Sequence, residues 1–457
     1  MNNKIKLAVA GAVFSAASVA NAGIVIPAGD WTLDVNGNVN AFANWTSNDN
    51  HAQEVTTGGL ATNQDVTGED NNQGINTGLL PAWLGFTGTT VTGGLANYED
   101  ASSEDNSYAI NTGLLPAWLG FTGTTRQNDL DVSFTISFQP NVSDNQSSGM
   151  GDTLTPLNRQ AFLTFGDKSW GTVKLGKDLG IFAGDAILSD MTLLGVGGAG
   201  HRSGGVTTLG GIGTGYIYPA WRGQIAYTTP NMNGFQATIA ITNPDQGQTG
   251  TDGSVNGGYN QDRFGVEGKV SYSWTGDVAG KVWASFADYD RNAAEVTAGN
   301  KGSTGFTATD WKEESFKTRA YDIGVNVTSG NLGLVGYYYN AEGAGTTLNL
   351  LGNDGYYFNS TTSVKERDSD GGYVQATYVI PTGTKLGLAY GVNNLDKASG
   401  EDDSDLLEKN ERWTVGAYHP LTKHLNLVAE YNKIESEAHN GNDADSDTFS
   451  LGAILFF

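Results

Sequence analysis

The sequence predicts an all-β fold, a transmembrane antiparallel β-barrel of sixteen strands. Three observations predict it: apolar and polar residues alternate with a period of two along many segments, the connections alternate between short and long, and aromatic residues stand near the segment ends. Successive side chains of a strand point to opposite faces, so each segment has one apolar and one polar face. In the last segment Phe449, Leu451, Ala453, Leu455 and Phe457 share the apolar face.

The alternating segments and their connections give the strand count. The predicted strands are 31–46, one of two Leu-Pro-Ala-Trp segments, 129–139, 159–166, 171–177, 220–229, 234–243, 261–275, 280–290, 317–328, 332–340, 373–380, 384–394, 410–419, 424–435 and 447–457. Tight turns follow every second strand, and long loops rich in Gly, Asn, Asp and Ser follow the others. This sorting of loop lengths is typical of an outer-membrane barrel, whereas a soluble sandwich has no reason for it. No apolar run after the N-terminus is long enough for a membrane-spanning helix.

Tryptophan placement supports the membrane prediction. Trp31, Trp45, Trp170, Trp221 and Trp274 stand at or near predicted strand ends. Aromatic girdles of transmembrane barrels lie at that level, where the lipid meets water. A barrel of sixteen strands is also wide enough to enclose an aqueous channel.

Composition excludes several other classes of protein. The 457 residues include 25 Lys and Arg against 49 Asp and Glu, giving a net charge of −24, and no cysteine. Nucleic-acid binding is disfavoured because phosphate contacts need clustered basic residues. The absence of cysteine excludes disulfides, thiol catalysis and Cys-based zinc sites. We find no motif for an enzyme, a cofactor or a metal site, so none is predicted.

The N-terminus reads as a secretory signal peptide over residues 1–22. Lys4 and Lys6 form a basic region, an apolar run follows from Leu7, and the run ends in Ala-Asn-Ala. This is the signature of an export signal, here cleaved after Ala22. Residues 23–457 then form the barrel.

A tandem duplication occupies residues 57–125. Residues 75–90 and 110–125 are identical at all sixteen positions, and each copy carries one loop and one Leu-Leu-Pro-Ala-Trp segment. Either the duplication adds two strands, which widens the barrel to eighteen, or one copy lies in an extended first loop. We favour the extra loop, because Val-Thr-Gly-Gly-Leu-Ala at 91–96 makes a poor membrane strand.

The chain resembles the general bacterial porins over most of its mature length. The residues that carry the resemblance are 29–33, 158–162 with 170–177, 218–227 with 231–234, and the C-terminal Phe457. The resemblance implies a homotrimer of sixteen-stranded barrels in the outer membrane that passes small hydrophilic solutes by diffusion. It also implies that Phe457 is the signal for the outer-membrane assembly machinery, and that the third long loop, 178–219, folds into the lumen as a constriction.

The residues of that loop agree with the implied constriction. Ile187, Leu188, Met191 and Leu194 follow the spacing of one helical face, which must be buried. Inside a barrel the available surface is the inner wall; packing against a neighbouring subunit is the alternative.

Rings of charge at the narrowest point set the selectivity of a pore. By analogy with the family, Asp190 presents a loop carboxylate, and Arg159 and Arg222 match the opposing basic cluster. Strand alternation agrees for Arg222 but is ambiguous for Arg159, which shares the parity of Ala161 and Leu163. Lys174 and Lys269 also read as lumenal, and Asp185 is a second candidate loop carboxylate. The candidate constriction residues are therefore Asp185, Asp190, Arg159, Arg222, Lys174 and Lys269.

The chain departs from the family at the constriction. Asn38 and Trp118 (or its copy Trp83) stand where general porins often carry basic residues, and Leu194 stands where a second loop acid is common. We therefore expect a weaker transverse field than in strongly charged porins.

Three function hypotheses follow. The first is an outer-membrane porin for passive diffusion of small hydrophilic solutes and ions. The second is a selective channel with a binding site for one solute class, acids or sugars, and the third is a surface adhesin or scaffold barrel. The acidic excess suggests a preference for cations, and acidic outer loops suggest divalent cations bridging to lipopolysaccharide. Most of these charges lie in outer loops, however, and charges more than ~8 Å from the solute path are screened at physiological salt.

Overall fold

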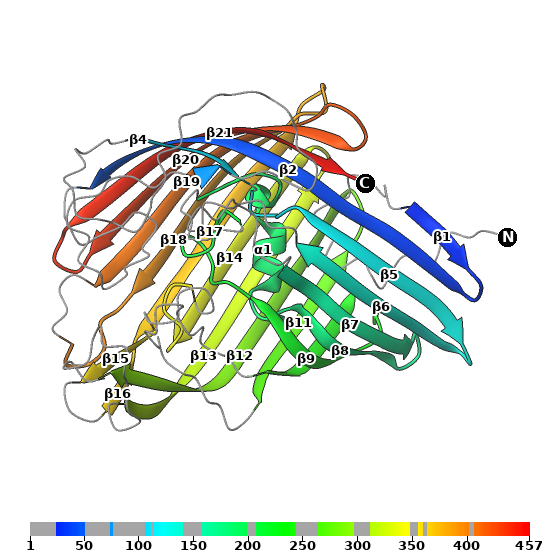
Figure 1. The fold of residues 1–457 in the computed structure, drawn as a ribbon, viewed down its shortest axis with the longest axis horizontal. Helices are drawn as coiled ribbons and strands as arrows, with labels where there is room; N and C mark the ends of the chain where they lie inside the picture. The colour runs from blue at the N-terminus through cyan, green and yellow to red at the C-terminus, as the bar shows by residue number, and fades with distance from the viewer. Residues whose placement is uncertain are drawn as a thin grey trace, which may run out of the picture.

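Figure 1 shows the chain as a wide β-barrel in a computed structural model. The structure describes residues 24–50, 74–75, 106–111, 113–139, 157–198, 207–243, 264–296, 311–347, 355–359, 363–401 and 406–457. Three parts of the chain lie outside these residues: the predicted signal peptide, parts of the long loops, and the first copy of the duplication with Trp83. Of that first copy only Gly74 and Ile75 are described.

Sixteen of the described strands close the barrel, as predicted. They are β2 (Trp31–Asn50), β5 (Trp118–Gln127), β6 (Leu130–Gln139), β7 (Leu157–Asp167), β8 (Gly171–Leu179), β9 (Trp221–Thr228), β10 (Phe235–Thr242), β11 (Gly265–Trp274), β12 (Val278–Val296), β13 (Trp311–Ser329), β14 (Leu332–Glu342), β17 (Asp368–Val379), β18 (Lys385–Leu395), β19 (Leu407–Pro420), β20 (Leu425–Ala438) and β21 (Asp443–Phe456). Each pairs antiparallel with the next, and β21 pairs with β2 to close the ring. Eighteen strands, the alternative left open by the duplication, is therefore not the architecture.

The C-terminus helps to seal the ring. Phe457 N donates to Gly37 O at 3.0 Å, and Gly37 N donates back to Phe457 O at 2.9 Å. Beyond this point β1 (Ile24–Ala28) pairs with the start of β2, on the stretch of β2 that β21 does not reach. β1 therefore extends the wall past the sixteen-stranded ring.

The two faces of the wall separate as the alternation predicts. On the outer face large apolar side chains are exposed, such as Ile225, Val374 and Val415. On the inner face polar residues alternate with small or aromatic ones, and Glu430, Asn432 and other charged or amide groups are buried there. An apolar belt outside and polar residues inside are what a lipid-embedded barrel requires.

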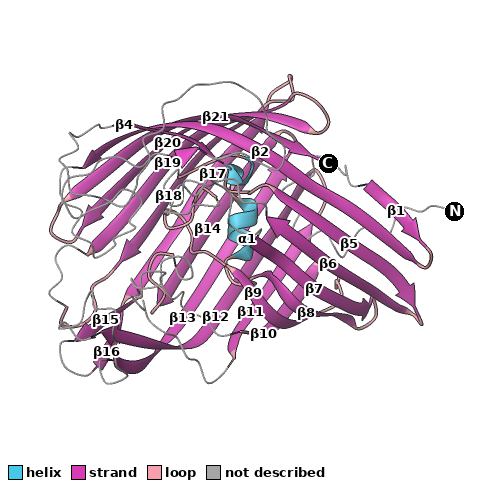
Figure 2. Cartoon of the chain, in the orientation of Figure 1, coloured by secondary structure: helices cyan, strands magenta, loops and turns pink. Residues whose placement is uncertain are grey.

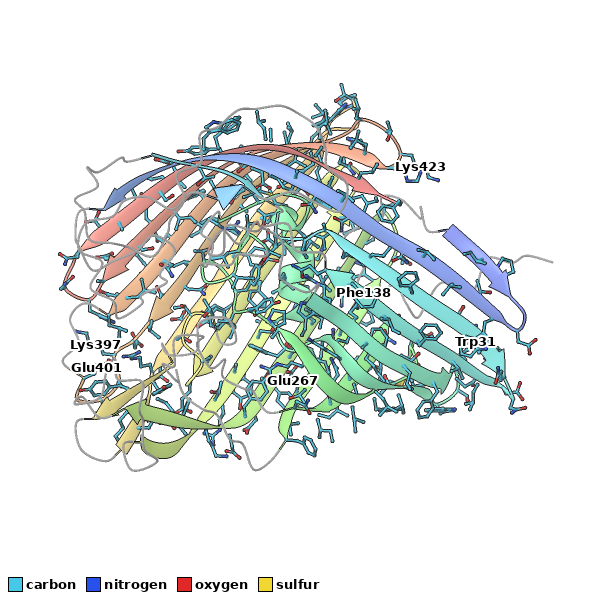
Figure 3. The ribbon with its side chains drawn as sticks, in the orientation of Figure 1. Trp31, Phe138, Glu267, Lys397, Glu401 and Lys423 are labelled. Atoms are coloured by element: carbon cyan, nitrogen blue, oxygen red, sulfur yellow. The ribbon has the colours of Figure 1, made fainter. Side chains whose placement is uncertain are left out.

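The two ends of the barrel differ, as Figure 3 shows. Trp31 and Lys423 lie at the end with the short turns, and Lys397 and Glu401 lie at the opposite end with the long loops. Asn128 and Asp129 form one of the tight turns with φ of 48° and 64°. Two successive positive φ values are those of a type I′ turn, the hairpin turn that matches strand twist.

The second copy of the duplication forms an interrupted strand. β4 (Asn106–Asn111) and β5 both pair with β2, Phe42 opposite Asn111 and Asn38 opposite Trp118. Residues 112–117 lie between them, and their Pro116 lacks the N–H that a continuous ladder needs. Of the first copy the structure describes β3 (Gly74–Ile75), which pairs in parallel with β4.

The remaining elements lie inside the barrel and at its long-loop end. Figure 2 shows the helix α1 (Gly184–Ser189) surrounded by strands in projection, and a 3-10 helix follows over Met191–Leu194. The hairpin β15 (Tyr356–Asn359) and β16 (Ser363–Glu366) stands at the loop end. Neither helix in the described chain has the length and apolar character to cross a membrane.

Candidate pore constriction

Residues 180–198 and 207–220, together called the belt, line the inner wall. The belt leaves the wall at the end of β8 and returns to it at β9. Its apolar side chains Phe182, Ala186 and Ile187 are buried in one cluster with the inward-facing aromatic residues of β12, β14 and β17. Because apolar burial favours the docked state, the belt is held against the wall and kept out of open water.

Three wall carboxylates accept hydrogen bonds from the backbone of the belt. Glu267 on β11 accepts from the N–H of Ile181 and Phe182 at 2.5 and 3.0 Å. Asp322 on β13 accepts from Ala183 N at 3.1 Å. These N–H groups have no partner within a strand or helix, so a buried carboxylate supplies the acceptor they need.

The third carboxylate holds the belt at its far end. Glu430 on β20 accepts from Val196 N and Gly197 N at 2.8 and 2.9 Å, and from Tyr418 Oη at 2.6 Å. Next to this point Gly195 O accepts from Leu114 N at 3.0 Å. The outgoing half of the belt therefore follows the wall from β11 to β20 and ends at the segment between β4 and β5.

The belt returns beside its own outgoing half. Gly198 N donates to Gly210 O at 2.8 Å, and Leu209 N donates to Gly198 O at 3.0 Å. Asn410 Nδ2 on β19 then donates to Gly213 O at 3.1 Å. The returning half of the belt is therefore hydrogen-bonded both to the outgoing half and to β19.

Asp190 lies within the belt, buried to 3 % exposure. Its Oδ1 accepts from Thr192 N at 2.9 Å, and its Oδ2 accepts from Tyr216 Oη at 2.8 Å. Arg412 of β19 places a guanidinium nitrogen 3.7 Å from Oδ2. Burial and the Asp190 carboxylate raise the pKa of Tyr216 well above its ordinary value.

Asp190 also explains why the predicted helical face is split. It stands in extended conformation, with φ −67° and ψ 127°, and caps the 3-10 helix through Thr192 N. Two short helices therefore replace one continuous helix. Ile187, Met191 and Leu194 are buried as expected, and Leu188 is partly buried against the same apolar cluster as Ile187.

Asp185 faces two lysines of the wall. Its Oδ2 lies 2.7 Å from Lys269 Nζ on β11, and its Oδ1 accepts a hydrogen bond from Lys281 Nζ on β12. Burial by itself would raise the pKa of Asp185, but the two ammonium groups outweigh it and lower the pKa to about 2. The carboxylate is thus paired with the same wall on which the belt packs.

Arg222 is buried on the inner face of β9. Its Nε lies 3.3 Å from Glu267 Oε1, and its guanidinium carbon lies 4.5 Å from the ring centroid of Tyr289. The strand register places Asp178 directly opposite Arg222 on β8. The arginine is therefore paired with Glu267, the same wall acid that binds the belt.

Lys174 and Arg159 lie elsewhere on the wall. Lys174 pairs with Asp178 four residues on and lies 5.1 Å from the ring centroid of Phe162. Arg159 donates to Gln139 and lies over the Trp221 ring at 4.4 Å. The structure brings neither of these two bases into ion-pair distance of Asp185 or Asp190.

Hydroxyl groups lie on the inner face of β5, β6 and β7. Thr122 and Thr135 are hydrogen-bonded at 3.1 Å between β5 and β6. Ser133 and Thr164 are hydrogen-bonded at 2.6 Å between β6 and β7. Lys174 on β8 lies directly opposite Thr164, so this part of the lumen surface carries hydroxyl groups beside one base.

Several residues that position the belt are absent from our sequence candidates. They are Glu267, Lys281, Asp322, Arg412 and Glu430. On its strand each of these residues has two outward-facing sequence neighbours and therefore points inward, as Lys269 does between Gly268 and Val270. The same alternation that indicated Lys269 could therefore have indicated them.

Comparison with known proteins agrees with the barrel. Residues 7–440 match the sequence profile of the Gram-negative porin family, and the chain belongs to this family. It is an outer-membrane channel for passive diffusion. A search of functionally curated proteins found no significant sequence match.

Solved structures share the fold at low sequence identity. The outer-membrane channel DcaP of Acinetobacter baumannii is 14 % identical, with a TM-score of 0.60 over 94 % of this chain and 99 % of that one. OmpF of Salmonella typhi, solved with daunomycin, is 14 % identical with a TM-score of 0.52, over 95 % and 100 %. OmpT of Vibrio cholerae is 13 % identical with a TM-score of 0.52, also over 95 % and 100 %.

Proposed function

We propose that the belt is the constriction of the channel, and that solutes cross between the belt and the wall formed by β5–β8. The observation that carries this proposal is the course of the belt, from the end of β8 along the inner wall to its hydrogen bond with Leu114. The water path then has the belt on one side and the hydroxyl-rich wall on the other.

We infer weak ion selectivity from the charge pairing. Asp185 is neutralised by Lys269 and Lys281, and Asp190 is accompanied by Arg412. A strong transverse field needs acids on the belt facing bases across the lumen. The pairs found here instead join the belt to its own wall, which leaves small neutral or weakly charged hydrophilic solutes as the favoured cargo.

The six candidate residues take different parts in this proposal. The side chains of Lys269 and Lys174 are partly exposed and act on passing ions. Asp185 is buried and acts on those ions by compensating the charge of Lys269. Asp190 and Arg222 are buried and act by holding the belt in place. Arg159, stacked on Trp221, belongs to the loop end of the wall.

The assembly state and export route are part of the same proposal. We propose a homotrimer in the outer membrane, exported by residues 1–22 with cleavage after Ala22. Phe457, whose backbone bonds to Gly37, is the proposed signal for the assembly machinery. Lipopolysaccharide is the proposed lipid partner at the long-loop end. No catalytic role is proposed.

Liposome swelling tests the proposal. Proteoliposomes with the refolded mature protein should swell in uncharged sugars at rates that fall smoothly with solute mass. One class of sugar or acid entering far faster than others of equal mass, with saturation, would favour the selective channel instead. Intact vesicles that do not swell in any small solute would contradict a diffusion channel.

A further inference from the structure

The segment 113–117, called the wedge below, interrupts the barrel wall next to β2. Six residues, 112–117, separate β4 from β5, whereas three residues, 39–41, separate the corresponding partners on β2. Three residues are therefore in excess, and the chain must leave the ladder here. A bulge of this kind redirects the chain away from the strand axis.

Two asparagines of β2 hold the wedge in place. Asn40 Oδ1 accepts from Gly113 N at 3.1 Å, and Asn40 Nδ2 donates to Leu115 O at 2.8 Å. Asn38 Nδ2 donates to Pro116 O at 3.2 Å. Both asparagines are buried, at 1 % and 2 % exposure. The side-chain amides thus replace ladder hydrogen bonds that the interruption removes.

The wedge meets the belt at the point where the belt turns back. Leu114 N donates to Gly195 O at 3.0 Å. The Leu114 side chain is 4 % exposed within the belt's apolar cluster. A Cβ at Gly210, whose φ is +57°, would collide with Leu114 Cδ2. The wedge and the returning half of the belt are therefore in close contact, and the positive φ favours glycine at position 210.

On the other side the same turn of the belt is tied to the wall. Glu430 accepts from Val196 N and Gly197 N. Leu115 packs against the apolar cluster that includes Met191 and Leu194 of the belt. The tip of the belt is thus fixed between β20 and the wedge.

We propose that the wedge holds the tip of the belt in place by direct contact. Through this contact it sets the open cross-section of the channel on the side of β2 and β5. Leu114, Asn38 and Asn40 are then positioning residues for transport. This inference rests on the proposed role of the belt as the constriction. It also explains why position 38 is a neutral amide, since the amide group is used to hold Pro116 O.

A three-residue deletion tests the proposal. Deleting residues 114–116 leaves three residues between Asn111 and Trp118, the number that faces them on β2, so the register of β4 and β5 with β2 is kept. Glu430 still ties the tip to β20, so a gap should open between the tip and the wall. We expect higher single-channel conductance and a higher size limit for uncharged polyethylene glycols than in the wild type.

A matched pair of substitutions serves as the second test. Leu114→Ala shortens the wedge contact, whereas Leu119→Ala removes the same side chain from β5 next to Phe138 on the outer face. Leu114→Ala should raise the conductance and the size limit, and Leu119→Ala should leave both at the wild-type value. Folding is checked by heat-dependent electrophoretic mobility and circular dichroism.

The outcomes separate this inference from the proposed function. If the folded deletion and Leu114→Ala variants keep the wild-type conductance and size limit, the proposed role of the wedge is wrong. It is also wrong if Leu119→Ala raises the conductance and size limit as much as Leu114→Ala does. If the deletion variant does not fold, the Leu114→Ala and Leu119→Ala pair decides. A wild type without channels would contradict the proposed function itself.

Discussion

Asp185 Oδ2 on the belt lies 2.7 Å from Lys269 Nζ on β11, so a charge expected to face the lumen is bound to the wall behind it. Lys281 shares the same carboxylate. The cluster of one acid and two bases carries a net positive charge, and both lysine side chains are partly exposed, at 23 % and 32 %. The belt thus contributes little free negative charge at this point.

Asp185→Asn should shift the channel toward anions. Without the carboxylate, the two ammonium groups remain uncompensated beside the water path, and field strength at a constriction sets selectivity. The reversal potential in a KCl gradient measures the shift. Asp288→Asn is the control, because Asp288 forms its ion pair with Arg319 on the outer face of the wall, where both side chains are exposed. Equal reversal potentials in the wild type and Asp185→Asn would contradict the assignment.

The effect of the Asp185 carboxylate on the reversal potential should be independent of pH between 7 and about 4. The reason is that the pKa of Asp185 in the folded protein is about 2, against an ordinary 3.8. For a carboxyl with a lowered pKa, the ion pair stabilises the docked belt fully above the ordinary value. That contribution is lost as pH falls through the folded value. The difference in reversal potential between wild type and Asp185→Asn measures this. A difference that vanishes near pH 5 would show an ordinary, unpaired carboxylate.

Arg222→Ala should destabilise the barrel more than it changes selectivity. Arg222 is buried beside Glu267, and removing one partner of a buried ion pair costs about 3–5 kcal/mol. Urea unfolding in lipid vesicles measures the loss of free energy. The exposed Arg126, near the end of β5 beside a short turn, provides the control substitution Arg126→Ala, which should leave unfolding nearly unchanged. An unfolding curve for Arg222→Ala that matches the control would contradict the buried pairing.

Glu430→Gln should loosen the tip of the belt. The amide keeps one oxygen but loses the charge that two backbone N–H groups and Tyr418 share. Hydrogen bonds to a charged group contribute about 1.5–3 kcal/mol, so the docked state weakens by that order. Increased open-channel current noise and more frequent closures under voltage are the readouts. Glu435→Gln, on the exposed face of the same strand, is the control and should behave as wild type.

The strands were predictable because their signal is local. Period-two alternation and turn residues lie within each segment, and all sixteen predicted strands have counterparts in the ring. Pro116 in the Leu-Leu-Pro-Ala-Trp segment was a sign that this strand is interrupted, since proline disrupts a central ladder. Our prediction treated the segment as one strand.

The contacts of the belt were less predictable because they are not local. Alternation shows that Glu430 faces the lumen, but its partners Val196 and Gly197 lie more than 200 residues away. Which wall residue meets which loop atom depends on the register of every strand between them. The sequence could therefore indicate lumenal charges such as Lys269 and Arg222, but not that the belt acids pair with their own wall.

Planar-bilayer recording of the refolded mature protein tests the central claim most directly. The claim is an open, weakly selective channel narrowed by a belt fixed to the wall. It predicts conductance steps in groups of three and a small reversal potential in a salt gradient. Absent steps, or a reversal potential near the limit for a single ion type, would contradict it.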